Sequence, residues 1–184
     1  MADELHNQLF AIRRSVRYHD RRTGFFERLH RSTNVITILL AGVALMELAG
    51  KGPPLLIKIL AVIGAVLGSA DLIIGFSRHA DLHRDLKRRF VRLERQIDDK
   101  SDPHDIRRKR LDIEAEEPPI YRVLDLLCHN EMCAAAGHNI KDDAEHFYRI
   151  PFLQKLTANL LRWENFSATV RTFADPKAGV LNLW

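Results

Sequence analysis

Two apolar segments near the middle of the chain dominate its pattern of hydrophobic and polar positions. A short Gly-Pro turn separates them, and neither has the polar face of a soluble amphipathic helix. The second segment, residues 54–77, reaches the roughly 20 residues that a helix needs to cross a bilayer, with Lys58 and Asp71 inside it. The first, residues 33–49, is marginal by length. The pattern predicts a transmembrane hairpin over residues 34–77; a helical hairpin buried in a soluble core is the alternative.

Basic residues are concentrated on both outer sides of this hairpin, whereas its turn holds Lys51 alone. Because Lys and Arg are in excess on the cytoplasmic side of membrane proteins, we expect a multi-pass protein of the cell (inner) membrane with both termini cytoplasmic. The net charge of +4 is then best matched to anionic lipid, and no nucleic acid is expected as a partner. The flanking residues are Arg13, Arg14, Arg17, Arg21, Arg22, Arg28 and Arg31 before the hairpin, and Arg78, Arg84, Lys87, Arg88, Arg89, Arg92 and Arg95 after it.

Residues 1–33 and 78–184 carry helical patterns and are predicted to be cytoplasmic. Apolar residues recur three or four positions apart on each side of the hairpin, so the two helices that leave the membrane can pack together as a stalk. Pro103 is suited to the first turn of a further helix. The predicted fold is all-α, a two-helix transmembrane hairpin with long cytoplasmic helical extensions. The stripes are Leu5, Leu9, Ile12 and Val16, and Leu82, Leu86, Phe90, Leu93 and Ile97.

A C-terminal amphipathic helix completes the predicted fold. Its apolar residues share one face, and basic residues surround them, a combination that suits a membrane interface when Trp is present. Packing of this face against the preceding helices is an equally good explanation. The face consists of Phe152, Leu153, Leu156, Leu160, Trp163 and Val170.

Small residues recur along one face of the second predicted span. At helical spacing they let helix backbones approach closely in lipid. A single hairpin cannot use all of its small-residue surface, so we expect contacts with other copies and a homo-oligomer. The stripe consists of Ala61, Gly64, Gly68 and Gly75.

Asp71 lies on the same face and is the most informative single residue of the span. An ionisable side chain inside a bilayer is costly and commonly faces a bundle interior or a water-filled path. Asp71 is therefore a candidate for lining or gating a pore. The alternative is structural, with Asp71 protonated or paired with Arg78 or Arg14.

The segment EAEEPPIYRVLDLLCHNEMCAAAG, residues 114–137, is the most distinctive cytoplasmic stretch. Pro118 and Pro119 are expected to start a helix and Gly137 to cap its end. Cysteine, histidine and glutamate side chains here suggest metal binding, but the spacing of Cys128 and Cys133 places them on different faces and no CxxC or HExxH is present. We expect no metal and no cofactor, and cysteines that pack in a helix face. The metal candidates considered are Cys128, His129, Glu131, Cys133 and His138.

The arginine-flanked hairpin followed by EPPIYRVLDLLCHNE resembles the SLATT family, two-span membrane effectors associated with SMODS nucleotidyltransferases and SLOG sensors. The resemblance covers roughly residues 4–170. It implies a prokaryotic antiphage or conflict effector that perforates the membrane when a cyclic nucleotide signal or a sensor protein triggers it. The motif consists of Pro118, Pro119, Tyr121, Leu124, Asp125, Cys128, His129, Asn130 and Glu131.

Three classes of function remain compatible with the sequence. The first is an oligomeric pore or membrane-disrupting effector, and the second is a membrane-anchored signalling or interaction scaffold without conductance. An enzyme is disfavoured because the chain has no nucleophile elbow, metal motif, phosphate loop or pair of carboxylates at one site. Asp71 separates the first two classes, since a tether does not need an ionisable residue in mid-span.

Overall fold

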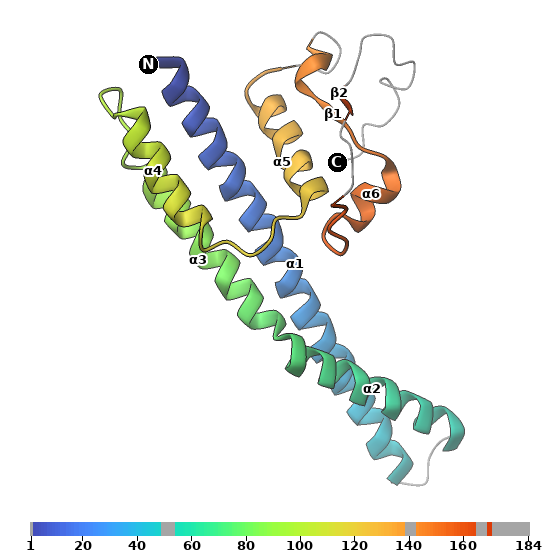
Figure 1. Cartoon of the computed structure of the whole chain (residues 1–184). Coiled ribbons are helices and arrows are strands. Elements are labelled where there is room, and N and C mark those ends of the chain that lie inside the picture. The colour runs from blue at the N-terminus through green and yellow to red at the C-terminus, as the bar shows by residue number, and fades with distance from the viewer. Residues whose placement is uncertain (1, 49–53, 139–142, 165–168, 171–184) are drawn as a thin grey trace. The chain divides into compact units, whose positions relative to one another are not determined.

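The computed structural model describes residues 2–48, 54–138, 143–164 and 169–170, and most of them are helical (Figure 1). This agrees with the predominantly helical fold that the sequence predicts, apart from a short antiparallel pair of strands in which Tyr148 lies opposite Val170. The elements are α1 (Ala2–Leu48), α2 (Pro54–Ile74), α3 (Phe76–Glu94), α4 (Pro103–Glu114), α5 (Arg122–Ala135), the 3-10 turn η1 (Ala144–His146), β1 (Tyr148–Arg149), α6 (Phe152–Thr157) and β2 (Thr169–Val170).

The chain divides into two compact units, and we describe each by itself. Unit 1 contains residues 1–20 and 86–184, and unit 2 contains residues 21–85. Helices α1 and α3 each begin in one unit and end in the other.

The first core of unit 1 joins α1, α3 and α4. Ile12 and Phe90 are fully buried, and Ile106 of α4 packs against them. Leu5, Ile12 and Val16 of the stripe predicted before the first span therefore pack with Phe90, Leu93 and Ile97 of the stripe predicted over residues 78–97, as expected for the stalk, whereas Leu82 is exposed. Leu93 is also a buried member of this cluster, and Leu5, Val16, Ile97 and Ile113 pack against it.

The second core of unit 1 attaches α5 to α1. Tyr18 of α1 is buried with Leu124 and Cys128 of α5, and Ile150 and Ala158 close the cluster. Helix α1 thus contacts α3 and α4 on one side and α5 on the other (Figure 1). Both cysteines are buried and free, in agreement with their predicted packing role.

The ends of α4 and α5 follow from local chemistry. The Asp102 side chain accepts a hydrogen bond from the His104 backbone N–H, and Pro103 occupies the first turn, as predicted. Helix α5 begins at Arg122 rather than at the prolines, because the residue before a proline disfavours the helical conformation and Pro118 itself precedes Pro119.

Gly137 ends α5, as predicted. Its φ of 93° is left-handed, and its N–H donates to the Ala134 carbonyl while the His138 N–H donates to the Cys133 carbonyl. These two bonds form a Schellman motif and fix the direction in which the chain leaves the helix.

The long C-terminal amphipathic helix is a wrong prediction. Helix α6 ends at Thr157, Trp163 has a positive φ of 48°, and Val170 lies in β2. The backbone N–H groups of Leu160 and Leu161 both bond to the Thr157 carbonyl, which turns the chain out of the helix. The helical spacing of the apolar residues was therefore not sufficient to keep them on one helix.

Unit 2 is an antiparallel helical pair formed by the second part of α1 with α2 and the start of α3 (Figure 1). Later residues of α1 contact earlier residues of α2 and α3, as expected for antiparallel helices. Glu27 bonds Arg84, His30 bonds Asp71, and Leu40 contacts Gly64. Gly75, with a left-handed φ of 67°, separates α2 from α3.

Among the described residues, one helical stretch, Lys58–Glu94, is long and apolar enough to cross a membrane. The first predicted span does not meet this description, and its end, together with the turn containing Lys51, lies outside the described residues. Among the described residues the structure therefore supports one membrane-length helix, which contains most of the second predicted span, while the first span stays a prediction. None of the apolar window in Lys58–Glu94 is buried.

Large apolar side chains are exposed along both helices of unit 2. Ile38 is 70% exposed and Leu72 87% exposed, whereas the helices of a soluble core would cover such side chains. Others on these helices are Val35, Leu39, Leu45, Leu55, Val62, Val66 and Ile73.

Candidate functional site

Asp71 is held by a histidine on the facing helix. The Oδ2 atom of Asp71 lies 3.0 Å from Nδ1 of His30, and Nε2 of His30 lies 3.1 Å from the side-chain nitrogen of Asn34. With the Asn34 amide donating to Nε2, the ring proton sits on Nδ1 and is donated to Asp71. Three polar side chains thus form a connected network between α1 and α2.

This arrangement differs from the ion pair considered in the sequence analysis. The partner of Asp71 is His30, rather than Arg78 or Arg14. Sequence reasoning did not single out His30, although an ionisable residue inside a predicted span is itself a signal that a polar partner should be sought on the neighbouring helix.

Aromatic and charged side chains surround the next turns of unit 2. The Phe26 ring stacks on His79 and His83, with centroid distances of 5.0 and 5.8 Å, and the Arg22 guanidinium lies 4.6 Å from the Phe26 centroid. One turn along, Arg84 bonds Glu27. Stacking and ion pairing therefore fix α3 against α1 next to the apolar segment.

The small-residue stripe has different roles along its length. Gly64 is buried, and a Cβ atom there would lie 3.0 Å from Cδ1 of Leu40, so Gly64 belongs to the contact between α2 and α1. Gly68 has open space around it, and Ala61 is exposed, which leaves these two positions available to other molecules. Gly75 forms the joint between α2 and α3.

The family-like motif of α5 is a packing device. The Tyr18 hydroxyl accepts a hydrogen bond of 3.0 Å from the Tyr121 backbone N–H, just before the helix. Asn130 makes two bonds of 2.8 Å with the Tyr148 backbone, one as donor and one as acceptor. Leu124 and Cys128 are buried in the core that joins α5 to α1. The motif therefore attaches α5 to α1 and to β1.

Charged motif residues are also used in packing. Asp125 lies 3.2 Å from Nε of Arg14, and Glu131 lies 3.7 Å from Arg17. Burial raises the pKa of the Asp125 carboxyl, with Arg14 acting in the opposite direction. Burial lowers the pKa of His129, whose ring is 5.3 Å from the Phe10 ring.

A buried histidine–glutamate contact lies just before the prolines of the motif. Nε2 of His19 is 3.0 Å from Oε1 of Glu117, and the two side chains are 1% and 5% exposed. The neighbouring Glu116 bonds Arg89 at 2.7 Å. Glu116 and Glu117 thus connect the segment before α5 to α3 and α1.

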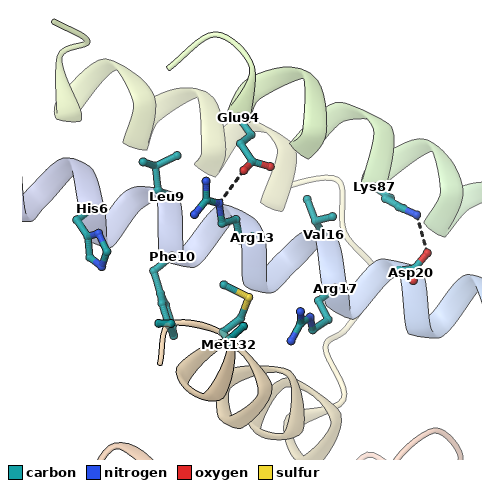
Figure 2. Close-up of a pocket in the computed structure, with 12 residues that line it drawn as sticks. His6, Leu9, Phe10, Arg13, Val16, Arg17, Asp20, Lys87, Glu94 and Met132 are labelled. Atoms are coloured by element: carbon teal, nitrogen blue, oxygen red, sulfur yellow. Dashed lines mark hydrogen bonds and ion pairs between the residues drawn. The ribbon is translucent and has the colours of Figure 1, made fainter. Parts of the chain in front are cut away.

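A cavity of about 470 Å³ lies in unit 1 beside α1 (Figure 2). Its apolar lining comes from α1 and α5, and Arg13, Arg17 and Lys87 stand at its edge. Arg13 bonds Glu94 at 2.7 Å, and Lys87 bonds Asp20 at 2.6 Å, as Figure 2 shows. The size is that of a small-molecule site. Apolar and other lining residues are His6, Leu9, Phe10, Val16, Met132, Ala135 and Ala136.

The cationic side chains that line the cavity are already paired with carboxylates of the protein. Arg17 also has a carboxylate nearby, Glu131 at 3.7 Å. The apolar part of an anionic ligand would therefore contact the apolar lining. Its negative group would replace a protein carboxylate as the partner of an arginine or lysine side chain. Sequence reasoning missed this cavity because its residues are dispersed over three helices.

Comparisons with protein-family models, with curated proteins and with solved structures give no match for this chain. The resemblance to the SLATT family rests on the hairpin pattern and the motif alone.

Proposed function

We propose that the chain is a two-span, homo-oligomeric membrane effector of the SLATT type, acting as a pore or membrane-disrupting protein in a prokaryotic antiphage system. The observation that carries the proposal is the uncovered apolar surface of unit 2, from Val35 to Ile73, with one polar network inside it. Lipid or other copies of the chain are the partners that such a surface requires.

The network of Asp71, His30 and Asn34 gives this effector a closed state. In that state His30 donates to Asp71 within one chain, so the carboxylate does not face hydrocarbon without a partner. In the open state the pair separates, and Asp71 residues from several copies form a hydrated ring. Because rings of carboxylates favour cations, the proposed pore is cation-selective.

The trigger reaches the protein in unit 1. The cavity of about 470 Å³, with arginine and lysine at its edge, suits a small anionic signal with an apolar part, such as a cyclic nucleotide. A sensor protein bound to the same unit is the other form of trigger. Helices α1 and α3 belong to both units, so either signal has a continuous helical connection to the apolar segment.

A membrane-anchored scaffold without conductance is the second candidate. The bond between Asp71 and His30 supports it, because a pair satisfied within one chain has no need of a central pore. The pore and the scaffold can be distinguished by removing the Asp71 carboxylate, because this change should alter ion flow only if the protein forms a pore.

The test is ion leakage with a charge-neutral substitution. Wild-type protein, Asp71→Asn and the control Asp112→Asn, an exposed carboxylate of α4, are reconstituted in liposomes of anionic and neutral lipid with a potassium gradient, and a cyclic nucleotide is added as the trigger. We expect wild type and Asp112→Asn to leak potassium, and Asp71→Asn to leak several-fold more slowly or to lose cation preference. Depolarisation of bacterial cells that produce each variant is the parallel measurement.

Equal potassium flux through Asp71→Asn and wild type would show that Asp71 does not line the pore. No flux from wild-type protein, in liposomes or in growth-arrested cells, would reject the pore and leave the scaffold as the function.

A further inference from the structure

Three side chains with metal-ligand chemistry meet where the chain leaves α5. His138, Asp143 and His146 each offer one ligand atom, and these atoms lie within 4.8 Å of one another. Nδ1 of His138 is 3.4 Å from Oδ2 of Asp143, and the rings of His138 and His146 are 4.5 Å apart between centroids. Two imidazoles and a carboxylate therefore converge on one point of unit 1.

The spacing is close to that of a tetrahedral site. With metal–ligand bonds of about 2.0–2.2 Å, neighbouring ligand atoms are separated by about 3.3–3.5 Å. The His138–Asp143 distance of 3.4 Å already has this value, and all three ligand atoms lie within 4.8 Å of one another. Nitrogen and carboxylate oxygen donors suit zinc and its neighbours in the first transition series.

The backbone that carries the histidines is fixed independently of these side chains. The Schellman motif at Gly137 holds His138, because the His138 N–H donates to the Cys133 carbonyl at 3.1 Å. The His146 carbonyl lies 3.2 Å from Nε2 of His129 and 3.5 Å from Sγ of Cys133. Two ligands thus start from positions that α5 defines, which reduces the entropy lost on binding a metal ion.

The local electrostatics favour a cation. The site lies beyond the C-terminal end of α5, where the helix dipole is negative, and Asp143 adds a full charge. Oε1 of Glu145 is 4.0 Å from Nε2 of His146 and supplies a further negative group at the edge. These groups would balance the charge of a divalent ion.

We propose that His138, Asp143 and His146 bind one divalent transition-metal ion, with zinc as the natural candidate. Three protein ligands leave the fourth position to water. The ion ties the end of α5 to η1 and so to β1, the strand that Asn130 already holds. Its role is to stabilise the part of unit 1 that carries α5, separately from any event in the apolar segment.

The test uses the full-length chain in detergent, purified without a histidine tag and treated with EDTA. Zinc chloride is titrated by calorimetry, and cobalt chloride is titrated as a spectroscopic probe. We expect one ion per chain, visible cobalt absorption of the intensity typical of four-coordination, and a higher unfolding temperature with zinc that EDTA reverses. His146→Ala should lower the zinc affinity at least tenfold, as should Asp143→Asn, which keeps the side-chain shape.

His104→Ala is the matched control, because His104 is an exposed histidine on α4, outside the cluster. It should bind zinc as wild type does. Circular dichroism melting without zinc shows which variants are folded, and a folded His138→Ala/His146→Ala double variant with wild-type zinc affinity would overturn the proposal. So would a wild-type chain whose unfolding temperature does not respond to zinc and whose cobalt spectrum is that of the free ion.

Discussion

The pair formed by His19 and Glu117 is the most completely buried ionisable contact described in unit 1, and its loss is expected to be costly. Glu117→Ala removes the carboxylate oxygen that lies 3.0 Å from Nε2 of His19. A buried polar group that loses its hydrogen bond destabilises a protein by about 1–3 kcal/mol. Urea denaturation of the detergent-solubilised protein should show this loss, and Glu117→Gln should retain more of the stability because its amide oxygen still accepts.

Glu116→Ala is the control for this prediction. Glu116 is 61% exposed and pairs with Arg89, and exposed ion pairs contribute about 0–1 kcal/mol. If Glu116→Ala destabilises the chain as much as Glu117→Ala, burial of the His19–Glu117 pair is not what matters.

Single residues show which kinds of site a sequence can predict. Asp71 was recognisable because a carboxylate in an apolar segment is rare and costly. Its partner His30 lies 41 positions away in the chain, and neither periodicity nor composition predicts a contact across that separation. The same holds for His138, whose neighbours Asp143 and His146 were not among the metal candidates that the sequence suggested.

At the scale of the helix pair in unit 2, two glycines of one stripe should respond differently to the same substitution. Gly64→Leu forces a side chain into Leu40, and overpacking of this kind costs about 1–3 kcal/mol. A Cβ atom added at Gly68 meets nothing within 4 Å in its own chain, so Gly68→Leu should lower the thermal stability of the monomer less than Gly64→Leu does. Thermal melting in detergent separates these outcomes.

Gly68→Leu then reports on contacts between copies. If the stripe forms the interface of a homo-oligomer, this variant should reduce the oligomer size in detergent, measured by light scattering, while Gly42→Leu, also in open space on α1, should not. An unchanged size for Gly68→Leu would place the interface elsewhere.

Helical elements were predictable where periodicity and termination signals agreed. Leu5, Ile12 and Phe90 pack as their spacing predicts, and Gly137 ends α5 as expected. The prediction of the C-terminal helix was wrong because it rested on the helical spacing of apolar residues alone. The turn at Thr157 depends on backbone hydrogen bonds, which this spacing does not predict. Pro118 and Pro119 misled in a similar way, since two adjacent prolines extend the chain before a helix rather than beginning it.

The division into two units was not evident from the sequence, which predicted boundaries at the ends of the apolar segment. Those segment boundaries stay a prediction; the division into compact units falls within α1, between Asp20 and Arg21, and within α3, between Asp85 and Leu86. Polar sequence on either side of these positions carries the same helical periodicity, so no change of composition marks the boundary. A unit boundary inside a helix depends on which partners each part of the helix contacts.

For the molecule as a whole, the distribution of basic residues predicts a single orientation in the membrane. With both arginine-rich flanks cytoplasmic, the turn that contains Lys51 is the part exposed outside the cell. Single cysteines placed at Lys51, Asn7 and Asn182 can be probed in intact cells with a membrane-impermeant maleimide. Native Cys128 and Cys133 are buried, which keeps the background low.

We expect Lys51→Cys to be labelled from outside, and Asn7→Cys and Asn182→Cys to react only after the cells are permeabilised. Labelling at Asn7 and Asn182 but not at Lys51 would reverse the orientation. Labelling at Lys51 and at only one terminus would mean that the chain crosses the membrane an odd number of times, as the single membrane-length helix Lys58–Glu94 allows. In that case the two-span hairpin is wrong, and Asp71 would have to be explained in a protein that crosses the membrane once.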